Sequence, residues 1–99
     1  NILEQGNTVT VVNNLIEAGV GKPATVIYRV EKKAHVTVGV YSVGGELVRM
    51  LVEEEQEADT YTVDWDGKNV EEQMVSTGIY YVIVKRGKGQ GEVRKVMVR

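Results

Sequence analysis

Apolar residues alternate with other residues along short stretches of this chain, and this alternation constrains its fold more than any other feature. In residues 35–41, Val36, Val38 and Val40 occupy every second position. Successive side chains of a β-strand point to opposite faces, so these three valines share one face. Residues 60–65 repeat the pattern, with aromatic and apolar side chains on one face and threonines with a carboxylate on the other. Both stretches are therefore predicted to be strands that are buried on one face.

Composition favours the same class of structure over the whole chain. Valine, threonine and tyrosine are common and leucine is not, and the first three residue types fit a pleated sheet. Seven strands are predicted, in residues 8–15, 24–31, 35–41, 47–52, 60–65, 79–86 and 92–98. Short strands separated by turn residues are typical of a sandwich of about 100 residues, so we predict an all-β, immunoglobulin/fibronectin III-like fold of two antiparallel sheets. The expected core residues are Val38, Tyr61, Val63, Trp65 and Val82.

Glycine marks most of the predicted turns, because it adopts positive φ at no steric cost. Residues 43–46 are expected to form a hairpin turn between two antiparallel strands. Two longer connections, the acidic residues 53–58 and residues 66–77, are expected to be solvated loops, and the sequence is compatible with a helical turn in residues 69–74. The residues assigned to turns are Gly44, Gly45, Asp66, Gly67 and Gly78.

The chain has 99 residues, a length that suits one domain with a single core. We treat residues 1–99 as one domain, with an N-terminal segment and the first strand in residues 1–22, and expect it to be a C-terminal fragment of a longer protein. The formal charge of -2 leaves no excess of cations for binding nucleic acid. No apolar run reaches the roughly 18 residues that span a bilayer, so membrane insertion is not expected. The first residues also lack the pattern of a signal peptide.

Residues that could perform catalysis are few. The chain has no cysteine, and its only histidine, His35, alternates with the apolar face of its strand and is expected at the surface. Paired carboxylates could instead supply acid–base chemistry, but no apolar surroundings are predicted that would shift the pKa values of the acidic run. The carboxylates of that run are Glu53, Glu54, Glu55, Glu57 and Asp59. We therefore expect no enzyme activity, no cofactor and no small-molecule ligand.

Calcium and sugar binding stay open as alternatives. Four side chains that carry oxygen atoms lie close together in the sequence, although their spacing is not that of an EF-hand loop. They are Asp64, Asp66, Asn69 and Glu71. In the alternative interpretation, Asp66 and Gly67 form a turn whose carboxylate accepts hydrogen bonds from nearby backbone N–H groups. A sugar site would need an exposed aromatic platform, whereas Trp65 follows the alternation of a core residue.

Three blocks of the sequence resemble a known family. The first contains Gly45, Val48, Arg49 and Leu51, the second is Trp65, Asp66 and Gly67, and the third covers residues 76–81. In this order they resemble the FlgD-type immunoglobulin-like domain, which is named for the flagellar hook-capping protein and occurs at the C-terminal ends of many bacterial surface and secreted proteins. The resemblance lies within residues 23–99. The C-terminal sorting domains of the type IX secretion system are related, and the residues that match them are Gly78, Tyr80, Val82, Lys95, Val96 and Val98.

This resemblance implies a non-catalytic accessory or structural module of an extracytoplasmic bacterial protein, secreted or at the cell surface. Such a module acts as a spacer or as an assembly domain, and its partners are neighbouring domains of the same chain or a surface or secretion assembly. A secretion-sorting or surface-attachment domain is one alternative, and a calcium- or glycan-binding module is another. Contacts with a partner would use the edges of the sheets, which we expect in residues 8–12 and 93–98.

Overall fold

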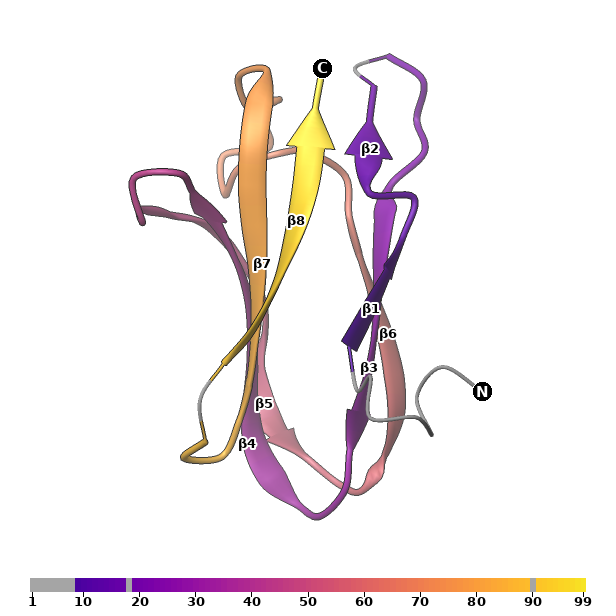
Figure 1. Ribbon diagram of the computed structural model, residues 1–99, viewed down its shortest axis with the longest axis vertical. Coiled ribbons are helices and arrows are strands. Elements are labelled where there is room, and N and C mark those ends of the chain that lie inside the picture. Colours follow the sequence, from indigo (N-terminus) through magenta and orange to yellow (C-terminus); the bar gives the residue numbers. More distant parts are fainter. Residues whose placement is uncertain (1–8, 18, 90) are drawn as a thin grey trace.

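The computed structural model describes residues 9–17, 19–89 and 91–99, which form eight strands in two sheets (Figure 1). The three-stranded sheet has the order β1-β3-β6, with bounds Val9–Val12, Ala24–Val30 and Asp59–Trp65. The five-stranded sheet has the order β2-β8-β7-β4-β5, with bounds Leu15–Ile16, Glu92–Val98, Gly78–Arg86, Ala34–Ser42 and Leu47–Gln56. The predicted all-β, two-sheet sandwich is confirmed. Within the described residues, no helix is long and apolar enough to cross a membrane.

The prediction of one strand in residues 8–15 is wrong, because this part of the chain forms two strands in different sheets. β1 pairs antiparallel with β3, whereas β2 lies parallel to β8. Between them Asn13 has a φ of 60°, and its Nδ2 donates a hydrogen bond to the Pro23 carbonyl oxygen at 2.9 Å. Asparagine is one of the few residues other than glycine that adopt this left-handed conformation readily, so the chain can turn here from one sheet to the other. Thr8 lies outside the described residues.

The prediction of a loop in residues 53–58 is also wrong for its first part, because β5 extends to Gln56. Glu53, Glu54 and Glu55 pair with consecutive residues of β4. Their side chains alternate between the two faces of the strand, which separates neighbouring charges and lowers their repulsion. Since β5 lies at the edge of its sheet, these carboxylates remain exposed to water, and an edge strand tolerates such charges.

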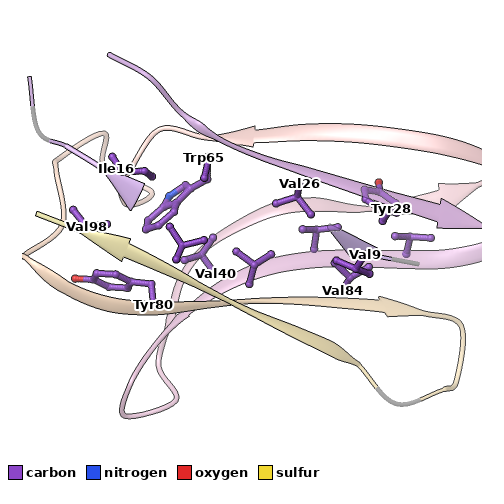
Figure 2. Close-up of a cluster of buried hydrophobic side chains, with 14 of the residues drawn as sticks. Val9, Ile16, Val26, Tyr28, Val40, Trp65, Tyr80, Val84 and Val98 are labelled. Atoms are coloured by element: carbon purple, nitrogen blue, oxygen red, sulfur yellow. The ribbon is translucent and has the colours of Figure 1, made fainter. Parts of the chain in front are cut away.

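Valine side chains from both sheets fill the space between them (Figure 2). Figure 2 shows Trp65 at the same end of the core as Tyr80 and Val98, and Tyr28 near the other end. Trp65 is fully buried, and its ring meets the ring of Tyr80 edge-on, with the ring centroids 5.5 Å apart. The structure also buries Val38 and Val82 completely, and it leaves Tyr61 and Val63 partly buried against the core.

The turn after β6 closes one end of this core. The indole Nε1 of Trp65 donates to the Lys68 carbonyl oxygen at 2.9 Å, and Asp66 Oδ1 accepts a hydrogen bond from the Lys68 N–H at 3.0 Å. Gly67 between them has a φ of 83°. This backbone conformation favours glycine, and a Cβ atom here would also lie 3.2 Å from Ile16 Cγ2 and displace the terminal methyl group of Met74.

Two of the other predicted turn residues, Gly44 and Gly45, also lie in a turn, whereas Gly78 belongs to a strand. Gly44 and Gly45 belong to the turn between β4 and β5, in which the Gly45 N–H donates to the Ser42 carbonyl oxygen at 2.9 Å. This confirms the hairpin predicted in residues 43–46. Gly78 is the first residue of β7.

A buried hydrogen bond connects the two sheets near the opposite end of the core. The Tyr28 hydroxyl donates to Gln56 Oε1 at 2.8 Å, and Gln56 Nε2 donates to Glu54 Oε2 at 3.1 Å. The Tyr28 ring stacks on the ring of Tyr61, with the centroids 5.6 Å apart. Burial of the Tyr28 hydroxyl is the main cause that raises its pKa, because ionisation would place a charge in a poorly solvated site.

We expect Trp65→Ala to lower the free energy of unfolding by about 3–5 kcal/mol, because it leaves a large cavity and removes the contact with Tyr80. Urea unfolding of the variant and the parent chain would measure this loss. Val70→Ala is the matched control, since Val70 is 76% exposed and its truncation removes almost no buried contact. A loss below about 1 kcal/mol for Trp65→Ala would show that Trp65 is not central to the core.

The free energy of unfolding should fall at alkaline pH, because the buried Tyr28 hydroxyl ionises there less readily in the folded than in the unfolded chain. A tyrosine whose pKa is higher in the folded than in the unfolded state stabilises the fold fully below its ordinary value of about 10, and this contribution is lost as the pH rises through the folded-state pKa. Tyr28→Phe removes the ionisable group, so the variant should lose less free energy of unfolding between neutral pH and strong alkali than the parent chain. Denaturant unfolding at a series of pH values tests this, and an unchanged alkaline loss in the variant would assign it to another group.

Candidate functional site

Trp65, the residue best suited to be a sugar platform, does not reach the surface. Its ring is enclosed between the sheets and its one polar atom is hydrogen-bonded to Lys68. An aromatic platform for a sugar must expose the face of its ring, so Trp65 cannot serve as one.

The four side chains considered for calcium do not converge on one point. Asp64 Oδ1 accepts a hydrogen bond from the Thr25 hydroxyl at 2.7 Å, and Asp66 Oδ1 is held by the Lys68 N–H. Glu71 lies in an exposed loop. Among the residues that the structure describes, no group of three or more Asp, Glu or His side chains is arranged to hold a metal ion. The Asp66 carboxylate instead serves the turn, as in the alternative interpretation of the sequence.

Asn69, the remaining calcium candidate, organises the loop between β6 and β7. Its Oδ1 accepts hydrogen bonds from the N–H groups of Glu71 at 2.9 Å and Gln73 at 3.0 Å. Lys68 and Met74 pair as an isolated antiparallel bridge, so the helical turn suggested for residues 69–74 is wrong. An asparagine side chain that caps backbone N–H groups competes with the helical hydrogen bonds of so short a segment, which explains the difference.

The acidic run is spread along a sheet edge and does not surround a pocket. Glu55 is opposite the exposed His35 in the β4–β5 pairing. Lys33 Nζ lies 3.7 Å from Glu55 Oε1 and 3.4 Å from Glu57 Oε2, and all three side chains are mostly exposed. Ion pairs of this kind are screened by water and contribute little to stability, so this cluster is a charged surface.

The edge strands of the two sheets carry backbone groups that have no strand partner on one side. β1 and β6 lie at the edges of one sheet, and β2 and β5 at the edges of the other. The first strand is thus an edge as expected. The prediction for the last strand is wrong over Met97 and Val98, because β2 pairs with these residues. Arg94 Nε of β8 also donates to the Val9 carbonyl oxygen of β1 at 3.1 Å, which joins the two sheets on that side.

On the opposite side of the sandwich, β5 of one sheet lies beside β6 of the other. Figure 1 views the molecule with β1 and β8 in front, so that β5 and β6 lie behind them. Apolar side chains of both strands are only partly buried there, namely Val48, Leu51, Val52, Tyr61 and Val63. A hollow on this side is lined by Arg49, Met50 and Leu51 of β5, by Val63 and Asp64 of β6, and by Asp66, Gly21 and Pro23.

Sequence reasoning missed this side because it depends on the order of the strands in each sheet. The first and last strands are natural candidates for edges, but β6 pairs only with β3 and β5 pairs only with β4, so these two inner strands of the sequence also form edges. One local signal was available: the run of glutamates in β5 resembles the charges that edge strands carry.

Comparison with known proteins agrees with this architecture. A family model described as the FlgD Ig-like domain matches residues 5–90. The structure of FlgD from P. aeruginosa is similar, with a TM-score of 0.64 and 18% sequence identity over 91% of this chain and 72% of that chain. PorZ, described as an essential bacterial surface component of the type IX secretion system of Porphyromonas gingivalis, gives a TM-score of 0.62 and 19% identity. That match covers 92% of this chain and 11% of the PorZ chain.

No curated protein matches the chain by sequence. At 18% and 19% identity, the two solved structures agree with the immunoglobulin-like fold and say nothing by themselves about function. The family model, by contrast, covers seven of the strands in full, from β1 to β7. This chain therefore belongs to the FlgD Ig-like domain family.

Proposed function

We propose that this chain is a non-catalytic accessory module that acts as a spacer or an assembly domain in an extracytoplasmic bacterial protein. One observation carries the proposal: the side chains best suited to bind a ligand are used by the fold itself. Trp65 fills the core, and Asp64, Asp66 and Asn69 accept hydrogen bonds from their own chain. Membership of the FlgD Ig-like domain family supports the same conclusion.

The similar structures support the extracytoplasmic setting and the role as one part of a larger protein. PorZ is described as a bacterial surface component, and the present chain corresponds to 11% of it. In FlgD from P. aeruginosa the matching region makes up 72% of the chain. We therefore propose that the partners of this module are neighbouring domains or the proteins of a surface assembly.

The isolated domain should be indifferent to calcium and to sugars. We expect Trp65 emission typical of a buried indole, little quenching by acrylamide, and one cooperative unfolding transition whose midpoint stays the same with calcium or bacterial glycans. Ligands that bind only the folded state raise the midpoint, so this measurement detects them without knowledge of the site. A raised midpoint or a readily quenched Trp65 would support the binding module instead.

A sorting signal is the second candidate, and one observation favours it. The two parts of the sequence that resemble type IX sorting domains are distant in the chain but adjacent in the sheet. Gly78 pairs with Val98 and Tyr80 pairs with Val96, so β7 and β8 present them as one antiparallel unit. A secretion machine could contact such a unit as a single surface.

Fusion of residues 1–99 to the C-terminus of a neutral secreted reporter separates the two candidates. In a bacterium with a type IX secretion system, the accessory role predicts that the fusion fractionates like the reporter alone. Relocation of the fusion to the cell surface would support the sorting role. The same fusion in a strain without a working type IX system is the control, because relocation that persists there has another cause.

A further inference from the structure

We propose that the free edge of β6, together with the hollow beside it, binds an extended segment of a partner protein by β-strand addition. This segment is basic and carries apolar side chains at alternate positions. The inference rests on the proposed function, since it names the surface through which an assembly module holds its partner.

Among the edges of the described sheets, that of β6 is the least protected against pairing. β1 has four residues and β2 has two, so neither offers a long template, and the part of β8 that β2 leaves uncovered carries Glu92, Arg94 and Lys95. β5 is longer, but its pairing with β4 shifts register at two places and it carries three successive glutamates. β6 has seven residues in unbroken register with β3, and the middle of the strand, Thr60 to Val63, is uncharged. Bulges, short length and charges are the usual protection of edge strands, and the centre of β6 has none of them.

The backbone of β6 presents hydrogen-bonding groups on its free side. Its single neighbour in the described sheet is β3. The Thr60 N–H donates to Asp59 Oδ1 at 2.8 Å, which places this N–H outside the ladder with β3. Because N–H directions alternate along a strand, the N–H groups of Thr62 and Asp64 point to the same free side. An added strand would find a regular set of donors and acceptors there.

The hollow beside this edge offers contacts for the side chains of an added strand. Val63 of β6 and Leu51 of β5 both line it and are only partly buried. An extended segment on β6 directs every second side chain toward the space between the sheets. Apolar side chains at those positions would cover Val63 and Leu51, which adds side-chain specificity to the backbone hydrogen bonds.

The negative charges around the β6 edge favour a basic segment as the partner. Asp59 and Asp64 lie on β6 itself, and Asp66 lines the hollow. On the neighbouring β5 the Arg49 Nη1 already donates to the Asn69 carbonyl oxygen at 2.9 Å. A second copy of this chain would bring two equally acidic β6 edges together, and like charges on adjacent strands are destabilising. Lysine or arginine in the added strand would instead be attracted.

The test titrates the isotope-labelled chain with the acetylated, amidated peptide KVTVKVTVK and follows amide NMR signals and hydrogen exchange. We expect slower exchange and chemical-shift changes at the N–H groups of Thr60, Thr62 and Asp64. The peptide EVTVEVTVE has the same alternation with acidic residues, and it should bind at least about tenfold more weakly. Equal binding of the two peptides, or changes confined to β1, β2 or β5, would overturn the proposal.

Variants then assign the binding to this edge. Asp59→Asn with Asp64→Asn removes two charges but keeps the oxygens that hold the Thr60 N–H and the Thr25 hydroxyl, and it should raise the Kd for KVTVKVTVK about fivefold. Glu71→Gln with Glu72→Gln removes two charges from the exposed loop and should leave the Kd unchanged. A larger rise in Kd for the Glu71→Gln, Glu72→Gln variant than for the Asp59→Asn, Asp64→Asn variant would count against the proposal.

Thr62→Pro removes an outward N–H without removing a bond to β3, and it should abolish binding. Thr62→Val keeps the backbone N–H and should bind the peptide like the parent chain. If Thr62→Pro does not fold, the charge variants decide whether the peptide binds at this edge.

Sedimentation measures whether the chain itself forms dimers. Dimerisation through β6 would overturn the proposal that the partner is a basic segment. If neither peptide binds but Trp65 remains buried and indifferent to ligands, only the strand-addition proposal fails. A ligand response of Trp65 would contradict the proposed function instead.

Discussion

The contact between the inner faces of the two sheets is the interaction on which the rest of this structure depends. A strand with alternating side chains has one apolar face that it cannot bury alone, and a single sheet has the same problem. Here valines of β3 meet valines of β4 and β7, and each fully buried valine contributes roughly 1.5–3 kcal/mol relative to an exposed one. The register of every pair of strands follows, because a shift by one residue would turn the valines toward water.

The two sheets meet along two sides of the sandwich, and different strands form the edges on each side. On one side Arg94 reaches from β8 to the backbone of β1, and β2 continues the sheet past β8. On the other side β5 lies beside β6, and apolar residues of both strands are only partly buried. A two-sheet fold always leaves edges, and here the pairing order leaves β5 and β6 at edges, whereas the crossing at Asn13 places β2 beside the end of β8.

Several polar side chains of this domain hold the fold together. The Tyr28 hydroxyl connects the sheets through Gln56, and the Asp66 and Asn69 side chains replace backbone partners in the loop after β6. Buried side-chain polar atoms in the described residues all have hydrogen-bond partners. This arrangement agrees with the proposed role as an accessory module, which would contact a partner through the backbone of its sheet edges and the charges beside them.

The sequence by itself determined the class of fold and most of its strands. The alternation around Val38 and around Val63 is a local property of the strand, and so it predicted β4 and β6 without knowledge of their partners. The burial of Trp65 and the turn at Gly67 followed from the same local patterns. Tertiary structure decided what depends on distant segments: the break at Asn13, the extension of β5 to Gln56, and the free edge of β6. These features arise from pairing between strands that are far apart in the chain, and a pattern of neighbouring residues does not contain that information.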